Sequence, residues 1–137
     1  DVRLERQCKN AALLAEALDK NPYVEKVNYP GLKSHPQYKI AVKQFKNGFG
    51  AMLSFLMPED MDKINAFMRR LHIPHYAMTL GGFKTSLSYP VLSSHSNQSR
   101  EERLRIGITD GMMRVSVGME NAEELIQDFN QALEVFK

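Results

Sequence analysis

Two amphipathic helical patterns, one at each end of the chain, enclose a series of short strand-like segments. In the first pattern, apolar residues recur at three- and four-residue spacing over residues 4–18 and end before Pro22. The last pattern occupies residues 122–136, where Asn121 and Glu124 have the spacing of a helix cap. Each helix must bury its apolar stripe, which requires a packed layer between the two ends of the chain.

The segments between these helices predict that layer to be a small sheet. Strands are predicted at 23–29, 51–56 and 112–117, and helices at 36–45 and 58–68. The extended pieces 75–78 and 86–89 are expected to pair across a glycine turn, and 93–102 to form a polar surface loop. We therefore predict one domain over residues 1–137 of α/β (α+β) class, with a mostly antiparallel sheet and its helices packed on one face.

The charge and apolar patterns argue against nucleic-acid binding and against a membrane-spanning segment. The net charge of +2 comes from 18 basic and 16 acidic residues without a basic cluster, so nucleic acid is an unexpected partner. The apolar runs are far shorter than the roughly 20 residues that span a membrane. A lone Cys8, read as a small core residue, cannot form an intrachain disulfide, and no signal-peptide pattern begins the chain, so we expect a cytoplasmic protein.

The usual catalytic and metal-binding patterns are absent from the sequence. His72 and His75 are three residues apart, but Pro74 interrupts the helix that would place both on one face. No second cysteine or carboxylate cluster completes a ligand set, and no Gly-x-Ser-x-Gly elbow presents a nucleophile. We expect neither a metal nor a catalytic residue in this chain.

Arg114 is the one residue whose pattern indicates binding chemistry. It lies between Met113 and Val115 in a short apolar strand, where a buried guanidinium requires an anionic partner. Its planar fork favours a carboxylate or phosphate, and Ser116 on the same strand face could add a hydroxyl. The alternative is that this face is solvated and Arg114 points into water.

The segment GITDGMMRVSVGME, residues 107–120, resembles the C-terminal signature of the Cys/Met-metabolism pyridoxal-phosphate enzymes. That family includes methionine gamma-lyases and cystathionine lyases and synthases. Further blocks match in order over essentially the whole chain: YPGL at 29–32, SHP at 34–36, GFG at 48–50, MLSF at 52–55, TLGG at 79–82 and His95.

The resemblance implies roles for four residues. Arg114 matches the arginine that binds the substrate alpha-carboxylate, and Thr79, with Leu80 beside it, matches the position where the family usually has serine near that carboxylate. Lys84 replaces the family's glutamate, which reverses the charge near the mouth of the active site. Tyr89 stands before Pro90 where the family commonly has histidine.

The resemblance also implies what this chain does not contain. The family places its cofactor lysine, the acid on the pyridinium nitrogen and the phosphate cradle upstream of the matched region. We therefore expect the chain, which starts at Asp1, to be the C-terminal domain of a fold-type I pyridoxal-phosphate enzyme, inactive alone. The implied partners are a sulfur-containing amino-acid substrate, the missing cofactor-binding domain and further copies in a tetramer. The alternatives are a non-catalytic amino-acid-binding or regulatory module and a domain retained as an assembly surface.

Overall fold

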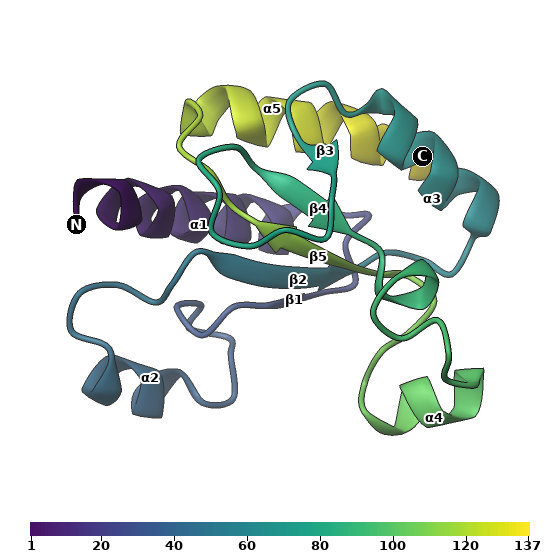
Figure 1. The fold of residues 1–137 in the computed structure, drawn as a ribbon, viewed down its shortest axis with the longest axis horizontal. Coiled ribbons are helices and arrows are strands. Elements are labelled where there is room, and N and C mark those ends of the chain that lie inside the picture. Colours follow the sequence, from purple (N-terminus) through teal and green to yellow (C-terminus); the bar gives the residue numbers. More distant parts are fainter.

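The computed structural model describes all residues, 1–137, as helices around one five-stranded sheet (Figure 1). The helices are α1 (Val2–Lys20), α2 (Tyr38–Gln44), α3 (Met61–Arg70), α4 (Arg100–Arg105) and α5 (Ala122–Leu133), with short 3-10 turns η1 (Pro90–Leu92) and η2 (Glu134–Phe136). The strands are β1 (Lys26–Asn28), β2 (Met52–Leu56), β3 (His75–Tyr76), β4 (Ser86–Ser88) and β5 (Met112–Ser116).

The strands lie in the order β1-β2-β5-β4-β3. The pairs β1–β2, β2–β5 and β4–β5 are antiparallel, which confirms the mostly antiparallel sheet. β3 and β4 pair as predicted, but in parallel, so the expected hairpin across a glycine turn is wrong. In a parallel pair, the connection must run back to the end of the sheet at which the first strand began. Residues 77–85 make this connection (Figure 1).

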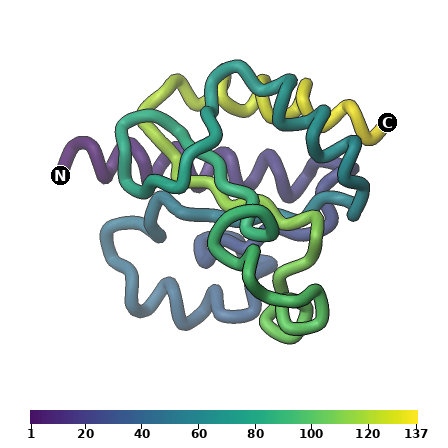
Figure 2. The backbone as a smooth tube through the Cα atoms, turned by 45° about the vertical axis from the view of Figure 1, so that its right-hand side comes forward, coloured from purple at the N-terminus to yellow at the C-terminus, as the bar shows by residue number.

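The helices α1, α3 and α5 cover one face of the sheet. Its inward side chains are fully buried in the core, among them Phe55, Met113 and Val115. The ring of Phe55 lies 6.1 Å from those of Phe67 in α3 and Phe129 in α5, in edge-to-face packing. Figure 2 shows α1 and α5, the purple and yellow ends of the chain, running together along this layer. For these three helices, the predicted packing on one face of the sheet is confirmed.

The helices α2 and α4 lie away from this layer, on the other side of the sheet (Figure 1). In α2 only Ala41 is buried, whereas Val42 and Phe45, predicted to share a packed face with it, are 43% and 48% exposed. Phe45 instead stacks edge-on against Phe49 in the following loop. The helix α2 packs against no strand and no other helix, so no core element covers these apolar side chains.

The ends of the other helices follow their sequence signals. The Asn121 side chain accepts the backbone N–H groups of Glu123 and Glu124, which confirms Asn121 as the cap of α5; the return bond from the Asn121 N–H to the Glu124 side chain, which a capping box requires, is absent. Ser99 and Glu102 form a capping box on α4. No helix in the structure combines the length and apolarity that a membrane crossing requires.

Candidate functional site

The second face of the sheet is not covered by helices, and Arg114 lies on it. Strand alternation places Met113 and Val115 in the core and therefore turns the side chain of Arg114 to the open face. The strand register sets Ser54 of β2 and Ser88 of β4 directly beside Arg114. Two small neighbours leave the guanidinium laterally unobstructed.

The half-buried Arg114 has no hydrogen-bond or ion-pair partner within the chain. The ion pairs of this protein join other residues: Arg100 with Glu59 and Asp110, Arg103 with Asp110, and Arg105 with Glu101. All five N–H donors of the Arg114 guanidinium are thus available to a ligand. A half-buried cation without a carboxylate neighbour is the electrostatic condition for binding an anion.

Arg114 borders a shallow hollow of about 320 Å³ on this open face. The lining is partly apolar and partly polar: Met52, Leu53, Pro90, Ile108 and Met112, with Asn28, Ser54, Ser94 and His95. The Asn28 amide donates to the Ser54 hydroxyl at 3.1 Å, which fixes both side chains. Such a lining suits a small molecule that combines a carboxylate with an apolar chain.

The loop between β3 and β4 is tied to the same face. The Ser86 hydroxyl donates to the Thr79 carbonyl at 3.1 Å, and the Gly81 N–H donates to the Ser116 hydroxyl at 3.0 Å. Ser116, expected to assist an anion beside Arg114, is therefore engaged with this loop. Thr79 and Leu80 are brought to the face that carries Arg114, although neither lines the hollow.

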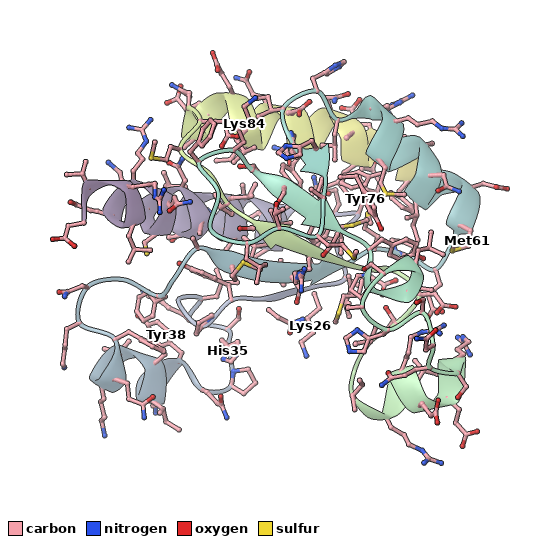
Figure 3. All side chains as sticks on the ribbon, viewed as in Figure 1. Lys26, His35, Tyr38, Met61, Tyr76 and Lys84 are labelled. Carbon is pink, nitrogen blue, oxygen red and sulfur yellow. The ribbon has the colours of Figure 1, made fainter.

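The structure places Lys84 apart from Arg114. The next residue, Thr85, is clamped by Glu120, whose carboxylate accepts the Thr85 N–H at 2.6 Å and its hydroxyl at 2.7 Å. Glu120 immediately precedes the cap of α5, and Figure 3 shows Lys84 at that end of the sheet. Its ammonium lies 5.9 Å from the Phe83 ring centroid and not in the hollow. A direct role for Lys84 at the carboxylate site stays a prediction.

Several lining residues had no predicted role. His95 matched a family block, yet its place in a serine-rich loop gave no periodic signal for where its ring would lie. In the structure its Nδ1 lies 2.7 Å from the Ser94 hydroxyl, and the ring faces the hollow. Ser54 could have been found from its alternation with the core residues Leu53 and Phe55 in β2.

The lining residues Pro90 and Ile108 belong to segments that are joined by polar contacts of Arg103, Asp110 and Tyr89. Arg103 is paired with Asp110 at 2.8 Å, and the hydroxyl of the fully buried Tyr89 donates to the Asp110 carbonyl. Burial raises the pKa of Tyr89 to about 12, with a further contribution from the Asp110 carboxylate and an opposing one from Arg103. Tyr89 therefore stays protonated and remains a donor at any physiological pH.

The hollow does not fit a complete pyridoxal-phosphate site. None of its lining residues is a lysine, which would be needed to bind the cofactor covalently, and none is a carboxylate for the pyridinium nitrogen. No group of three or more histidine, cysteine, aspartate or glutamate side chains is arranged to hold a metal. The chain's own residues fit a carboxylate.

The fold and the site together define a class of protein. It is an α/β domain with one helix-covered sheet face and one open face that presents an unpaired arginine in a partly apolar hollow. The family model for the Cys/Met-metabolism PLP-dependent enzymes matches residues 1–134. The chain belongs to this family.

Relatives and solved structures agree with this assignment. The chain is 45% identical over 134 residues to an L-methionine gamma-lyase of Fusobacterium nucleatum and covers 34% of that protein. It is 40% identical over 132 residues to a cystathionine beta-lyase of Coxiella burnetii, again covering 34% of the relative. The structure matches a cystathionine gamma synthase of Xanthomonas oryzae in complex with cystathionine, with a TM-score of 0.91 and 37% identity over 98% of this chain and 35% of that one. The chain thus spans about a third of the length of these relatives.

Proposed function

We propose that this chain is the C-terminal, substrate-binding domain of a pyridoxal-phosphate-dependent enzyme that cleaves or replaces C–S bonds in sulfur amino acids. Arg114 binds the substrate alpha-carboxylate. The observation that carries the proposal is the unpaired, half-buried guanidinium of Arg114 on the open face of the sheet. Family membership supplies the substrate class, and names such as methionine gamma-lyase and cystathionine beta-lyase among the relatives support it.

The remaining lining residues determine how the amino acid lies. Met52, Ile108 and Met112 offer an apolar surface to the side chain of a sulfur amino acid, while the polar groups gather around Arg114. Holding the carboxylate at two points fixes the orientation of the carbon next to it, which lowers the entropic cost of the reaction. This domain contributes the orientation of the substrate, and the loop between β3 and β4 supplies Thr79 and Leu80 to the substrate site.

The cofactor-binding part is proposed to lie outside this chain and to cover the open face. The loop between β3 and β4 exposes large apolar side chains: Met78 at 65%, Leu80 at 61% and Phe83 at 60%. Exposed apolar side chains grouped beside a binding face are typical of a surface that another domain covers. A complete protein would also assemble from several copies, as the family resemblance implies.

The isolated chain is expected to be catalytically inactive. Mixed with pyridoxal phosphate, it should give no saturable absorbance band and release no thiol or 2-oxo acid from methionine or cystathionine, because the hollow lacks a lysine. The full-length Fusobacterium methionine gamma-lyase serves as the positive control. A saturable band from one modified lysine, accompanied by turnover, would refute the proposed division of the protein.

The carboxylate site can be tested on this chain directly by nuclear magnetic resonance. Titration with L-methionine should shift the Nε–Hε signal of Arg114 with a Kd on the order of 10 to 100 mM, the affinity of one charge-assisted two-point contact. L-Methioninol, which lacks the carboxylate, should leave that signal in place. In an Arg114→Gln chain, the ring signals of His95, which lines the same hollow, should not respond to methionine. Equal shifts with both ligands would argue against carboxylate recognition.

A second candidate is a non-catalytic amino-acid-binding module. Arg114 and the hollow would serve it equally well, since neither contains a catalytic group. The reading frame upstream of this chain separates the two proposals: a continuous frame with a cofactor-lysine motif supports the enzyme, and its absence supports the module.

A further inference from the structure

Arg103 joins the two segments of the chain that carry His95 and Ile108, two residues that line the hollow. Arg103 is 8% exposed. Its Nη1 donates to the Gln98 carbonyl at 2.7 Å, and its Nη2 donates to the Asp110 carboxylate at 2.8 Å. Gln98 belongs to the loop that carries His95, and Asp110 to the turn that follows Ile108 and leads into β5.

Short hydrogen-bonded paths connect these contacts to the lining residues. The Gln98 N–H donates to the His95 carbonyl at 3.2 Å, and the Ile108 N–H donates to the Arg103 carbonyl at 2.9 Å. One backbone hydrogen bond therefore connects His95 to Gln98, which Arg103 contacts, and another connects Ile108 directly to Arg103. Both line the hollow that Arg114 borders.

Stability alone does not explain an arginine at this position. The Arg103 Nε is buried without a hydrogen-bond partner in the chain, which carries a desolvation cost. Replacing a whole buried ion pair by apolar side chains of similar volume is often neutral or even stabilising. The two contacts of Arg103 do, however, fix the relative position of two loops that contain no strand or long helix.

We propose that Arg103 is a positioning residue: by bonding Gln98 and Asp110 it sets the wall of His95 and Ile108 against Arg114 and thereby the affinity of the hollow for an amino-acid carboxylate. The inference rests on the proposed function of Arg114. Arg103 does not touch the ligand; it acts through the two loops.

The charges around Arg103 allow the role to be tested without unfolding the chain. The Asp110 carboxylate also lies 3.4 Å from Arg100 Nε, and its side chain is 26% exposed. When Arg103 is replaced, the Asp110 carboxylate can still pair with Arg100 and be hydrated by water. Methionine has a similar length and no charge, so Arg103→Met removes both contacts and keeps most of the buried volume.

The test is an L-methionine titration of this chain by nuclear magnetic resonance, with the His95 ring signals followed in parallel. Arg103→Met is expected to raise Kd by roughly threefold to tenfold, the range for a contact one step removed from a ligand, and to shift the His95 signals. Arg103→Lys keeps the charge but cannot bond both partners, so it should also weaken binding. Arg105→Met is the matched control, because Arg105 lies on the same helix, is 73% exposed and pairs only with Glu101.

The outcomes separate this inference from the proposed function. If both Arg103 variants bind methionine within twofold of the unmodified chain while Arg114→Gln loses binding, Arg103 does not position the site. If Arg114→Gln binds methionine normally, the assignment of Arg114 as the carboxylate site is wrong, and the proposed role of Arg103 is then wrong as well. If Arg103→Met does not fold, Arg103→Lys decides the question alone.

Discussion

Replacement of Gly111 by alanine is expected to lower the free energy of unfolding by about 3 kcal/mol or more, at or above the upper end of the cost of overpacking a core. A Cβ at this position would lie 1.8 Å from the carbonyl oxygen of Met57. The same two residues are joined by a hydrogen bond from the Met57 N–H to the Gly111 carbonyl at 2.9 Å. The backbone just after β2 or just before β5 must move to make room, and that hydrogen bond is lost.

Thermal unfolding measures this effect, as a fall in melting temperature of about 10 °C. Gly82→Ala is the control, since a Cβ there meets nothing closer than 3.7 Å and the backbone needs no positive φ. The control should stay within about 0.5 kcal/mol of the unmodified chain, as surface substitutions usually do. A Gly111→Ala chain that melts like Gly82→Ala would mean that β2 and β5 are not as close as the structure has them.

The glycines of the 107–120 segment show what sequence alone could give. The segment carried the family resemblance, but the sequence offered no physical reason for its glycines. The structure supplies one for Gly111 and another for Gly118, where a Cβ would lie 2.5 Å from the Phe83 carbonyl oxygen and the Thr85 nitrogen. Both reasons depend on residues distant in the chain, and local patterns contain no such information.

The elements that were predicted correctly are those with strong local periodicity. The helices α1 and α5 and the two faces of β5 follow from spacing because each must separate apolar from polar side chains. The parallel pairing of β3 with β4 could not be predicted, since strands of two and three residues carry almost no pattern. The loop that joins these strands is held by hydrogen bonds of Ser86 and Ser116, which local patterns do not predict.

The site was predicted less completely than the fold. Alternation in β5 required Arg114 to face away from the core, but it could not decide between water and a ligand. His95 and Arg103 contribute to the site from a loop and a short helix, where no periodicity indicates direction. Their positions depend on hydrogen bonds between neighbouring loop segments, and only the folded structure contains these bonds.

Replacement of Arg114 by lysine in the proposed full-length enzyme is expected to lower kcat/KM for a sulfur amino-acid substrate by roughly tenfold to 150-fold. Lysine keeps the positive charge but loses the planar two-point contact with the carboxylate, a charge-assisted bond worth about 1.5 to 3 kcal/mol. Cofactor binding should survive, because no residue of the Arg114 hollow fits the cofactor. Arg105→Lys, on an exposed helix face, is the control and should leave kcat/KM unchanged.

The same substitution in the isolated chain should change the free energy of unfolding little, because Arg114 has no partner within the chain and water reaches its hollow. The decisive measurement is therefore kcat/KM of the full-length Arg114→Lys enzyme together with the unfolding free energy of the Arg114→Lys chain. We predict a large loss in the first and almost none in the second. Normal kcat/KM, or a loss of several kcal/mol in the stability of the chain, would contradict the assignment of Arg114 as the carboxylate-binding residue.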